Sequence, residues 1–340
     1  MSVMRASVLR AVHDLALEER PVPQPGPHEV LVRISAVGVC GSDVHYYEHG
    51  RIGEHVVREP LVLGHEPAGE IVALGRDATR HAVGQRVSVE PGVPCLSCQQ
   101  CLAGRYNLCA RIRFLATPPI DGAFCEYLAI HEAFVHPVPD SLSDDAAAML
   151  EPLSVGVWAC RKGKVGPGSR VLVNGAGPIG LLAAQTAVAF GAGDVVVADV
   201  SEHRLRLAGA LGATRVVNVT GGSLADADVE PDVLLECSGH PQATADAIRT
   251  VAPAGRAVLV GMGADVLPLP LPYLQNREIE LVGTFRYANT WPTAIALAAS
   301  GRVVLDPLVT GHYTLPDVGA ALTAGATDPS TVKVLVTPTH

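Results

Sequence analysis

Hydrophobic residues in the first part of the chain come in short runs rich in β-branched side chains, a pattern typical of strands. Such runs cover residues 30–34, 68–74 and 86–89, and clusters of Pro and Gly, such as the one at residues 21–27, punctuate this part of the chain. The pattern predicts a β-rich domain over residues 1–153, with a small barrel or sandwich and long loops that can carry function.

From about residue 154 the pattern changes, because apolar runs of strand length alternate with longer segments rich in Ala and Leu. Strands followed by helices predict a doubly wound, parallel sheet, which we expect over residues 154–286. The expected elements are strands at residues 170–174, 194–198, 232–236, 256–261 and 279–283, and helices at 179–190 and 201–211.

The remaining segments complete this outline. The acidic segment 221–231 has few large apolar residues, so we expect it to be a surface connection. From residue 287 the chain is expected to return to the first domain, with a helix at 291–300 and a last strand at 332–336. No internal repeat or low-complexity tract interrupts this order.

Composition narrows the class of protein. A chain of 340 residues is long for one hydrophobic core, which agrees with two domains. Hydrophobic residues make up 48% and charged residues 17%, as in soluble globular proteins. The net charge of −9 and the lack of basic runs argue against a nucleic-acid partner. We find neither a signal-peptide pattern nor an apolar stretch of membrane-spanning length, so we expect a cytoplasmic protein.

The first strand of the second domain runs directly into the sequence Gly175-Ala-Gly177-Pro178-Ile179-Gly180. A lone Gly-x-Gly-x-x-Gly motif is a weak signal, but between a strand and a helix it predicts a dinucleotide site. Gly175 permits the tight turn, Gly177 lets a pyrophosphate approach the backbone, and Gly180 lets the helix pack on the sheet. Pro178 and Ile179 open the helix, whose N-terminus favours phosphate. The alternative is a tight turn that binds no ligand.

Asp199 ends the next expected strand, nineteen residues beyond Gly180. A carboxylate at this position accepts hydrogen bonds from the adenosine ribose hydroxyls and repels a 2′-phosphate, so it predicts NAD in preference to NADP. Arg204 follows closely in the sequence and weakens this prediction, because an arginine near the ribose can bind a 2′-phosphate instead.

Four of the eight cysteines are crowded into one short segment, as Cys95, Cys98, Cys101 and Cys109. Four thiolates at this spacing can surround one tetrahedral zinc ion and leave no position open, which is typical of a structural site. Two disulfides or an iron–sulfur cluster are the alternatives. A reducing compartment disfavours disulfides, and no redox partner is evident for a cluster.

A second set of potential ligands is mixed in type and comprises Cys40, His65 and Glu66. Thiolate, imidazole and carboxylate suit zinc, and three protein ligands leave a position open for substrate, as a catalytic zinc requires. Taken singly, each residue has another interpretation: a buried thiol, a core histidine, and a carboxylate that caps or pairs with Arg86. Glu151 is a further carboxylate that could act as a ligand or as a base.

Several motifs of the chain resemble those of the zinc-dependent medium-chain dehydrogenases, and within that family the sorbitol and xylitol dehydrogenase branch. The resemblance runs over nearly the whole chain and is carried by residues 38–47, 50–53, 63–66, 150–156 and 285–292. Many alcohol dehydrogenases have a cysteine where this chain has Glu151, whereas polyol dehydrogenases share the glutamate. Animal sorbitol dehydrogenases lack the complete four-cysteine site, which this chain keeps, and segment 221–231 is shorter than is usual in the family.

The resemblance implies a Rossmann-type doubly wound parallel sheet together with a β-rich, GroES-like catalytic domain. It also implies that Cys40, His65 and Glu66 hold a catalytic zinc and that Glu151 is either a fourth ligand or, as we favour, a base. Asp43 is expected to orient His65. The resemblance also implies that Ser42 and His45 pass the substrate's proton to solvent, although His45 could instead be an ordinary surface histidine.

A polyol carries several hydroxyl groups, so its pocket needs polar partners. Residues similar to those partners are Tyr46, Glu151, Arg286 and Tyr287, with Phe114 and Thr117 on the wall of the pocket. The nicotinamide half of the cofactor is expected to face another set of residues near strand ends, namely Val260, Gly261, Met262, Thr284, Phe285 and Arg286.

The resulting hypothesis is an NAD-dependent polyol dehydrogenase with two zinc ions in each subunit, one catalytic and one structural. The resemblance further implies a homotetramer that acts on a small-molecule polyol and has no membrane partner. The alternatives are oxidation of another secondary alcohol, such as threonine or a vicinal diol, and a non-catalytic nucleotide-binding protein. The pair Arg286 and Tyr287 argues for the polyol, and the intact set of zinc ligands argues against a non-catalytic protein.

Overall fold

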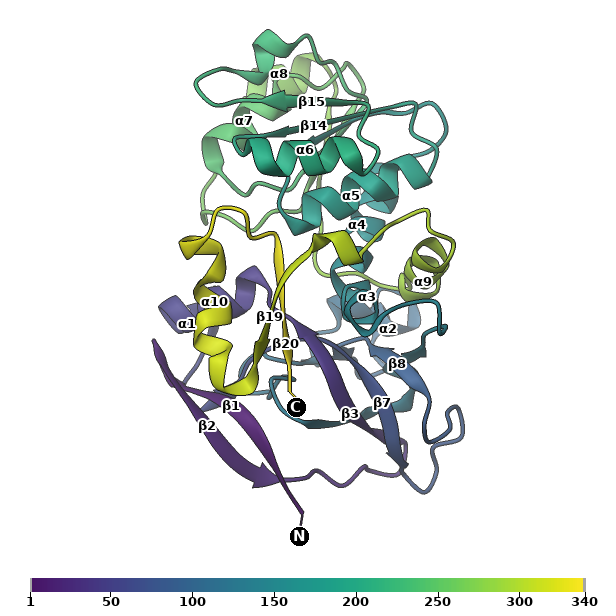
Figure 1. Cartoon of the computed structure of the whole chain (residues 1–340). Coiled ribbons are helices and arrows are strands. Elements are labelled where there is room, and N and C mark those ends of the chain that lie inside the picture. Colours follow the sequence, from purple (N-terminus) through teal and green to yellow (C-terminus); the bar gives the residue numbers. More distant parts are fainter. Residues whose placement is uncertain (1, 339–340) are drawn as a thin grey trace. The chain divides into compact units, whose positions relative to one another are not determined.

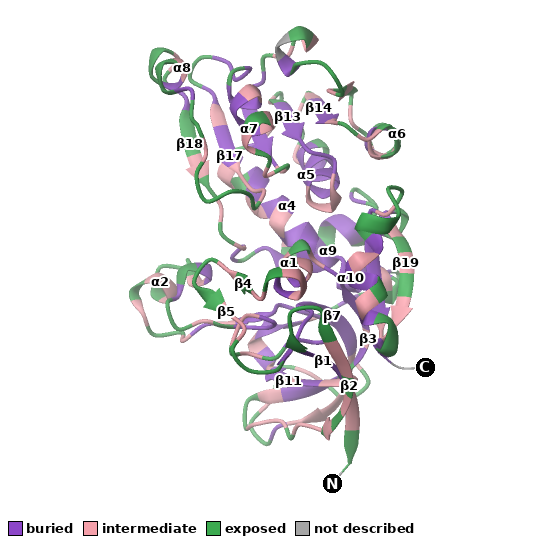
Figure 2. Cartoon of the chain, turned by 90° about the vertical axis from the view of Figure 1, so that its left-hand side faces the viewer, coloured by how far each residue is buried: buried purple, intermediate pink, exposed green. Residues whose placement is uncertain are grey.

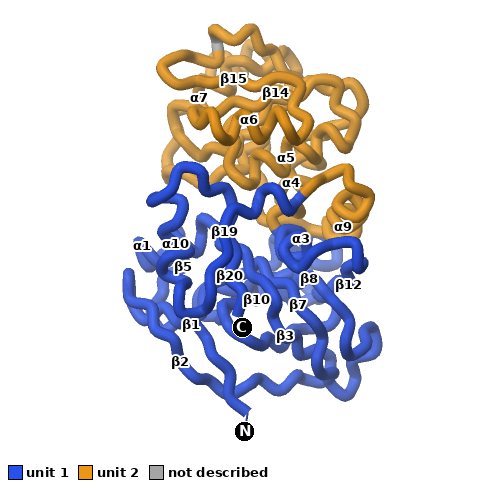
Figure 3. The backbone as a smooth tube through the Cα atoms, viewed as in Figure 1, with its two compact units in different colours: residues 1–151, 305–340 blue, residues 152–304 orange. Residues whose placement is uncertain are grey.

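The structure is a computed structural model that describes residues 2–338 and divides the chain into two compact units. Unit 1 comprises residues 1–151 and 305–340, and unit 2 comprises residues 152–304 (Figure 3). The boundary expected at residue 287 differs from this division, because helix α9 (Trp291–Ala299) groups with unit 2 instead of the returning segment.

Unit 1 is built around a seven-stranded sheet in the order β12-β8-β7-β3-β20-β19, with β11 paired to β3 (Figure 1). All neighbours are antiparallel except β19 and β20, which run parallel. The strands are β3 (Glu29–Gly38), β7 (Glu66–Leu74), β8 (Arg86–Val89), β11 (Tyr127–His131), β12 (Val135–Pro137), β19 (Val309–Thr314) and β20 (Lys333–Thr337). The C-terminal strand therefore lies inside this sheet, as the sequence predicted.

Smaller elements complete unit 1. A three-stranded sheet has the order β2-β1-β6, and two short antiparallel pairs, β4 with β5 and β9 with β10, accompany it. These strands are β1 (Val3–Ala11), β2 (Asp14–Pro21), β4 (Arg51–Ile52), β5 (His55–Val56), β6 (Leu61–Val62), β9 (Gly92–Val93) and β10 (Arg113–Phe114). The helices are α1 (Gly41–His49), α2 (Gln99–Leu102), α3 (Asp144–Ala148) and α10 (Val318–Thr327), with 3₁₀ turns at Tyr106–Leu108, Glu132–Phe134, Asp306–Leu308 and Leu315–Asp317.

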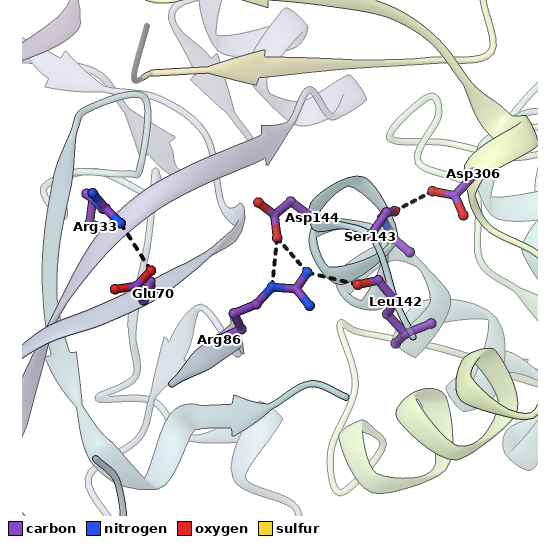
Figure 4. A network of polar contacts seen from close by, with 8 residues as sticks. Arg33, Glu70, Arg86, Leu142, Ser143, Asp144 and Asp306 are labelled. Atoms are coloured by element: carbon purple, nitrogen blue, oxygen red, sulfur yellow. Dashed lines mark hydrogen bonds and ion pairs between the residues drawn. The ribbon is translucent and has the colours of Figure 1, made fainter. Parts of the chain in front are cut away.

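Alternation of side chains explains the main sheet of unit 1. Val32 and Ile34 of β3 are buried in the hydrophobic cluster, whereas Arg33 between them is exposed and pairs with Glu70 on the neighbouring β7 at 3.0 Å (Figure 4). Val334 and Val336 of β20 belong to the same cluster. Because successive side chains of a strand point to opposite faces, one set of residues lies in the core and their neighbours lie at the surface.

Unit 2 is a six-stranded parallel sheet in the order β15-β14-β13-β16-β17-β18, of which Figure 1 labels β14 and β15. Its strands are β13 (Arg170–Asn174), β14 (Asp194–Asp199), β15 (Arg215–Asn218), β16 (Val233–Glu236), β17 (Arg256–Leu259) and β18 (Glu280–Gly283). Its helices are α4 (Leu150–Gly163), which begins in the last residues of unit 1, α5 (Pro178–Ala189), α6 (Glu202–Ala210), α7 (Pro241–Ile248), α8 (Leu271–Asn276) and α9, with a 3₁₀ turn at Leu224–Ala227. The predicted doubly wound, parallel sheet is confirmed.

The central strands of unit 2 are covered on both faces. Leu172 and Val173 of β13 point to opposite faces of the sheet and both are fully buried, as is most of helix α5 (Figure 2). Continuous apolar runs are expected for such strands. The strand order reverses direction between β13 and β16, and open parallel sheets bind their ligands at the carboxyl ends of the strands beside such a switch point.

One prediction for this unit was wrong in part. The segment 221–231 is mostly exposed, but it contains a 3₁₀ turn whose Leu224 is buried in the hydrophobic cluster of unit 2. It is therefore not a pure surface connection. No helix within residues 2–338 combines the length and the apolar character that crossing a bilayer requires.

Candidate metal and nucleotide sites

Asp43 joins the two turns that carry the mixed ligand set. Cys40 is the N-cap residue of α1, and its N–H donates to Asp43 Oδ2 at 3.0 Å. Gly64 N–H donates to the other carboxylate oxygen of Asp43 at 2.9 Å, and the next residue is His65. A fully buried carboxylate thus fixes both backbones, in addition to the predicted orienting of His65, whose Nδ1 lies 3.6 Å from Asp43 Oδ1.

Glycines create the space for this ligand set. Gly64 has a φ of +87°, which favours glycine, and a Cβ there would lie 2.7 Å from the ring of Phe124. A Cβ on Gly38, the last residue of β3, would overlap the carboxylate of Glu66 on the paired strand β7. Both positions exclude a larger side chain, Gly64 because the Phe124 ring occupies that volume and Gly38 because the Glu66 carboxylate does.

The three predicted ligands converge. One donor atom each of Cys40, His65 and Glu66 lie within 4.8 Å of one another. The buried Oε2 atom of Glu66 accepts no hydrogen bond of normal geometry, and its partner is the Lys333 ammonium, whose Nζ lies 2.5 Å away. A thiolate, an imidazole and a carboxylate at this separation fit a zinc ion with three protein ligands.

Neighbouring charges set the protonation of this group. Burial lowers the pKa of His65, but the charge of Asp43, whose Oδ1 lies 3.6 Å from His65 Nδ1, and the Cys40 thiol outweigh burial and raise that pKa well above its ordinary value. Burial raises the pKa of Asp43, and the charge of His65 with the hydrogen bonds from Cys40 and Gly64 brings it below its usual value. Metal binding to His65 must therefore displace a proton, which links metal affinity to pH.

Lys333 is the residue of this site that the sequence reasoning missed. It lies on β20, and its Nζ donates to Glu66 Oε1 at 2.7 Å, with both side chains buried. Burial lowers the pKa of Lys333, but the charges of Glu66 and Cys40 raise this pKa by more than burial lowers it. The net shift is therefore upward, and the ammonium stays charged. A lysine within the apolar run at residues 332–336 was the available signal, because lysine is almost never fully buried unless it is paired.

The alternative pairing of Glu66 with Arg86 is wrong. Arg86 Nη2 lies 2.6 Å from Asp144 Oδ1 and 2.8 Å from the Leu142 carbonyl, and Ser143 donates to Asp306 (Figure 4). These contacts attach the start of α3 to β8 and to the returning segment. They fix the stretch of chain that leads into α4 and Glu151.

Glu151 lies in the first turn of α4 and is buried. It contributes to the raised pKa of Lys333, which places its charge near the ligand set, but it is not one of the residues whose donor atoms cluster there. Phe114 lies against this set, with its ring centroid 5.7 Å from that of His65. The N–H of Thr117, which is also predicted to line the pocket wall, donates to the Phe114 carbonyl at 3.1 Å.

The other predicted residues of α1 have different environments. Tyr46 is buried in the hydrophobic cluster of unit 1, so its ring has a packing role whatever its hydroxyl contacts. Ser42 is half-buried and His45 is exposed. The Nδ1–H of His45 donates to the Arg51 carbonyl at 2.7 Å, so the predicted proton transfer would use Nε2.

The four-cysteine group also converges. Its Sγ atoms lie within 4.8 Å of one another, with Cys98 and Cys101 3.4 Å apart and Cys95 and Cys101 3.9 Å apart. All four thiols are free, so the disulfide alternative is wrong. A tetrahedron with Zn–S bonds of about 2.3 Å has edges of about 3.8 Å, which fits one ion at the centre. Hydrogen bonds from Ser97 lower the pKa of Cys95 to about 5, whereas burial and the neighbouring thiols raise the pKa of Cys101 to about 12, so the thiols of this group do not ionise equally.

In unit 2 the glycine-rich turn has the expected form. Gly175 has a φ of +99°, and a Cβ on Gly180 would overlap the Gly175 carbonyl, so helix and turn touch. Among the described residues, no atom lies within 4 Å of a Cβ built on Gly177, the N-cap of α5. That face of the helix N-terminus, where Pro178 and Ile179 follow, is open to a phosphate.

Asp199 stands at the end of β14 beside this turn. Its Oδ2 accepts from the Ala176 N–H at 2.6 Å and its Oδ1 accepts from the Ser201 N–H at 2.7 Å. These bonds fix the carboxylate at the edge of the sheet where an adenosine ribose would lie. Arg204 lies one turn into α6, where its N–H donates to the N-cap Ser201 Oγ at 3.4 Å.

The predicted nicotinamide residues follow two neighbouring strands of unit 2. Val260 and Gly261 come directly after β17, with Met262 exposed beyond them, and the Thr284 hydroxyl after β18 donates to the Leu259 carbonyl at 2.8 Å. The Arg286 guanidinium, on a residue with a φ of +51°, lies 4.8 Å from the centre of the exposed Phe285 ring. Tyr287 is buried, with its ring 5.3 Å from that of Trp291. Their roles stay predictions.

Two family models match the chain. Residues 26–140 match the alcohol dehydrogenase GroES-like domain, and residues 178–300 match the zinc-binding dehydrogenase family. The sorbitol dehydrogenase of Bacillus subtilis is 44% identical to this chain over 326 residues, which cover 94% of the chain and 92% of that protein. The similarity is therefore to a whole dehydrogenase.

Solved structures agree in fold. The L-idonate 5-dehydrogenase of Escherichia coli K-12 superposes with a TM-score of 0.93 at 31% identity and covers 99% of this chain and 98% of its own. The 2R,3R-butanediol dehydrogenase of Bacillus subtilis gives a TM-score of 0.90 at 30% identity over 99% of this chain and 100% of its own. Both metal-ligand groups and the nucleotide turn thus occur on a dehydrogenase fold.

Proposed function

The chain belongs to the zinc-dependent medium-chain dehydrogenases, close to the sorbitol dehydrogenases, and from this premise we propose that it oxidises a secondary hydroxyl of a polyol, such as sorbitol or xylitol, to a ketose with NAD. The observation that carries the proposal is the convergence of Cys40, His65 and Glu66 in a chain so similar to a sorbitol dehydrogenase. A mixed ligand set with an open position is the arrangement of a catalytic zinc, not of a structural one.

Each residue then has a role. A zinc ion at these ligands would lower the pKa of the substrate hydroxyl, and a bound nicotinamide would supply the acceptor for the hydride. Cys40, His65 and Glu66 would hold the metal, while Asp43 keeps the two ligand turns together. Glu151 would act as a base, which its place outside the ligand cluster supports. Ser42 and the Nε2 atom of His45 would pass the proton to solvent.

Substrate recognition would come from polar groups suited to a polyol. Arg286 offers several N–H donors, and Tyr46, Thr117 and Tyr287 offer hydroxyl groups. Phe114, which packs near His65, would form the apolar wall. The domain roles follow: unit 1 would be the GroES-like catalytic domain and unit 2 the Rossmann NAD-binding domain.

The direct experiment is turnover before and after metal removal. NADH formation from sorbitol and xylitol is followed by the absorbance of the reduced nicotinamide. We expect activity that is lost after chelator dialysis and restored by zinc. Activity that survives complete removal of the metal would contradict the proposed mechanism.

We propose a second, structural zinc at the four-cysteine group, and Cys98→Ser tests it. The variant should lose one of two zinc equivalents and keep its affinity for NADH, because the group lies in unit 1. Loss of a metal present at a hundred times its Kd lowers the free energy of unfolding by about 2.7 kcal/mol. Zinc content by atomic absorption and urea unfolding are the measurements. An unchanged zinc content would contradict the site.

We propose NAD in preference to NADP on the basis of Asp199, and Asp199→Ala tests this choice. Loss of charge-assisted hydrogen bonds to the ribose should weaken NADH binding about tenfold or more, and loss of the negative charge should improve binding of NADPH. Fluorescence titration measures both constants. Asp194→Ala, at the opposite end of the same strand β14, is the matched control. Equal affinity of the wild type for both dinucleotides would contradict the prediction.

Another secondary alcohol is the second candidate substrate, because the chain is also similar to a butanediol dehydrogenase.

We also propose a reducing, cytoplasmic location, which the eight free cysteines support, and a homotetramer. The open edge of β18, with Leu281 exposed, supports association of subunits. Light scattering on a sizing column measures the oligomer, and a monomer would contradict it.

A further inference from the structure

Glu236 is a buried carboxylate that the proposed chemistry does not use. It is the last residue of β16 and is only 2% exposed. Its position is beside β13, where the order of the parallel sheet reverses. Burial of a carboxylate is unfavourable unless its oxygens are hydrogen-bonded, so the donors that surround it show what it holds.

Those donors come from the turn that follows β16 and from the end of β13. Oε1 accepts from the Ser238 N–H at 2.9 Å, from the Ser238 hydroxyl, and from Asn174 Nδ2 at 3.3 Å. Oε2 accepts from the Gly239 N–H at 3.3 Å. One carboxylate thus fixes the 238–239 turn and ties it to the residue that directly precedes the glycine-rich turn.

The main chain of Glu236 holds the next segment as well. Its carbonyl accepts from the N–H groups of Val260 and Gly261 at 2.8 and 2.9 Å. Glu236 is therefore joined by hydrogen bonds to elements on both of its neighbouring strands. These elements are the ends of β13 and β17, at the carboxyl edge of the sheet.

Glycines bring the backbones of these segments into direct contact. A Cβ on Gly175 would lie 2.8 Å from the Ser238 nitrogen, and one on Gly261 would overlap the Gly239 nitrogen. Gly239 itself has a φ of +64°, and a Cβ there would overlap the Met262 carbonyl. With no side chains between the segments, a shift of the 238–239 turn must move the glycine-rich turn or the 261–262 segment.

We propose that Glu236 is a positioning residue for the nicotinamide cofactor, which holds the 238–239 turn in contact with the glycine-rich turn on one side and with residues 260–262 on the other. This role rests on the proposed function, because both flanking segments are residues that we assign to NAD. The carboxyl edge beside the switch point is where open parallel sheets bind such ligands. Preorganisation of the edge lowers the cost of ordering it when the cofactor binds.

Glu236→Gln tests this proposal, because it keeps the size of the side chain and directs an NH₂ group at backbone N–H donors. We expect the Kd for NADH to rise about 10- to 100-fold, as expected for the loss of one or two charge-assisted hydrogen bonds. With saturating cofactor, the KM for the polyol and the zinc content should stay within about twofold of the wild-type values, a difference no larger than the scatter of such assays. Direct NADH fluorescence titration and steady-state kinetics measure these constants.

Two further variants make the test decisive. Asp232→Asn is the same chemical change at the other end of β16, where Asp232 forms an exposed ion pair with Arg170, and it should leave the Kd for NADH unchanged. Ser238→Ala removes the hydroxyl that donates to Glu236 and accepts from the His240 N–H at 3.2 Å, while the backbone donors to Glu236 stay. It should weaken NADH binding less than Glu236→Gln, yet still measurably, which keeps the test valid if Glu236→Gln does not fold.

Two outcomes would overturn the positioning role. The first is a Glu236→Gln variant with a lowered urea midpoint and wild-type affinity for NADH, which would show a purely structural carboxylate. The second is an unchanged NADH affinity of Ser238→Ala together with an unfolded Glu236→Gln. A wild-type protein that binds neither NADH nor NADPH would instead refute the proposed function, and this role with it, so the two failures are distinguishable.

Discussion

Cys40→Ser is expected to abolish turnover while the fold persists. The Sγ atom of Cys40 belongs to the cluster of three donor atoms, and a serine hydroxyl is a poor zinc ligand because it stays protonated near neutral pH. Zinc contributes several kcal/mol to the stabilisation of developing charge, and a loss of about 4 kcal/mol corresponds to a thousandfold. We therefore expect kcat/KM for the polyol to fall by at least about a thousandfold.

Cys125→Ser is the matched control for this prediction. Cys125 is also a thiol of unit 1, and it is buried and outside both metal groups, with Sγ 3.2 Å from the Tyr127 carbonyl. A hydroxyl can donate to the same carbonyl, so activity should stay close to that of the wild type. Zinc content and kcat/KM are measured on both variants. A Cys40→Ser enzyme that keeps both its zinc and its activity would show that this cysteine is not a ligand.

Lys333→Met is expected to have the largest effect on stability. Its ammonium group is buried against the equally buried carboxylate of Glu66, at 2.7 Å from Oε1. Removal of one partner of a buried ion pair leaves an uncompensated charge, which costs about 3–5 kcal/mol. We expect the free energy of unfolding of the metal-free protein to fall by about this amount in urea titrations.

The metal itself provides a control for the Lys333 prediction. Zinc bound to Glu66 would compensate the carboxylate, so the destabilisation should be smaller in the zinc-loaded enzyme than after chelator dialysis. The double variant Lys333→Met/Glu66→Gln removes both charges and should recover much of the lost stability, because neutral pairs of similar volume are tolerated in place of buried ion pairs. Equal stability of Lys333→Met and wild type without metal would show that the pair contributes nothing.

Local patterns predicted most of unit 2 well. The strands at 170–174 and 194–198 and the helix at 179–190 match β13, β14 and α5 closely. Their apolar runs are buried on both faces, so the hydrophobic pattern alone is enough to identify these elements. Strand β15 was missed because it is an edge strand whose residues are mostly exposed, and exposure removes the hydrophobic signal.

One helix of unit 1 and the contacts between distant residues were harder to predict. Helix α10 was missed because its Ala- and Gly-rich sequence carries little hydrophobic contrast between its faces. The two metal groups could be recognised because each combines residue types that share one chemistry. Their supports could not: Lys333 meets Glu66 across most of the chain, and Asp43 bonds to backbone groups that no residue type reveals.

Substrate specificity tests the proposed function most directly. The measurement is kcat/KM of the zinc-loaded enzyme with NAD for sorbitol and xylitol, beside threonine and 2,3-butanediol under the same conditions. We expect the polyols to be favoured by at least about tenfold, because polar groups matched to several hydroxyls discriminate against substrates that leave them unpaired. Turnover of threonine or butanediol without polyol activity would contradict the polyol dehydrogenase.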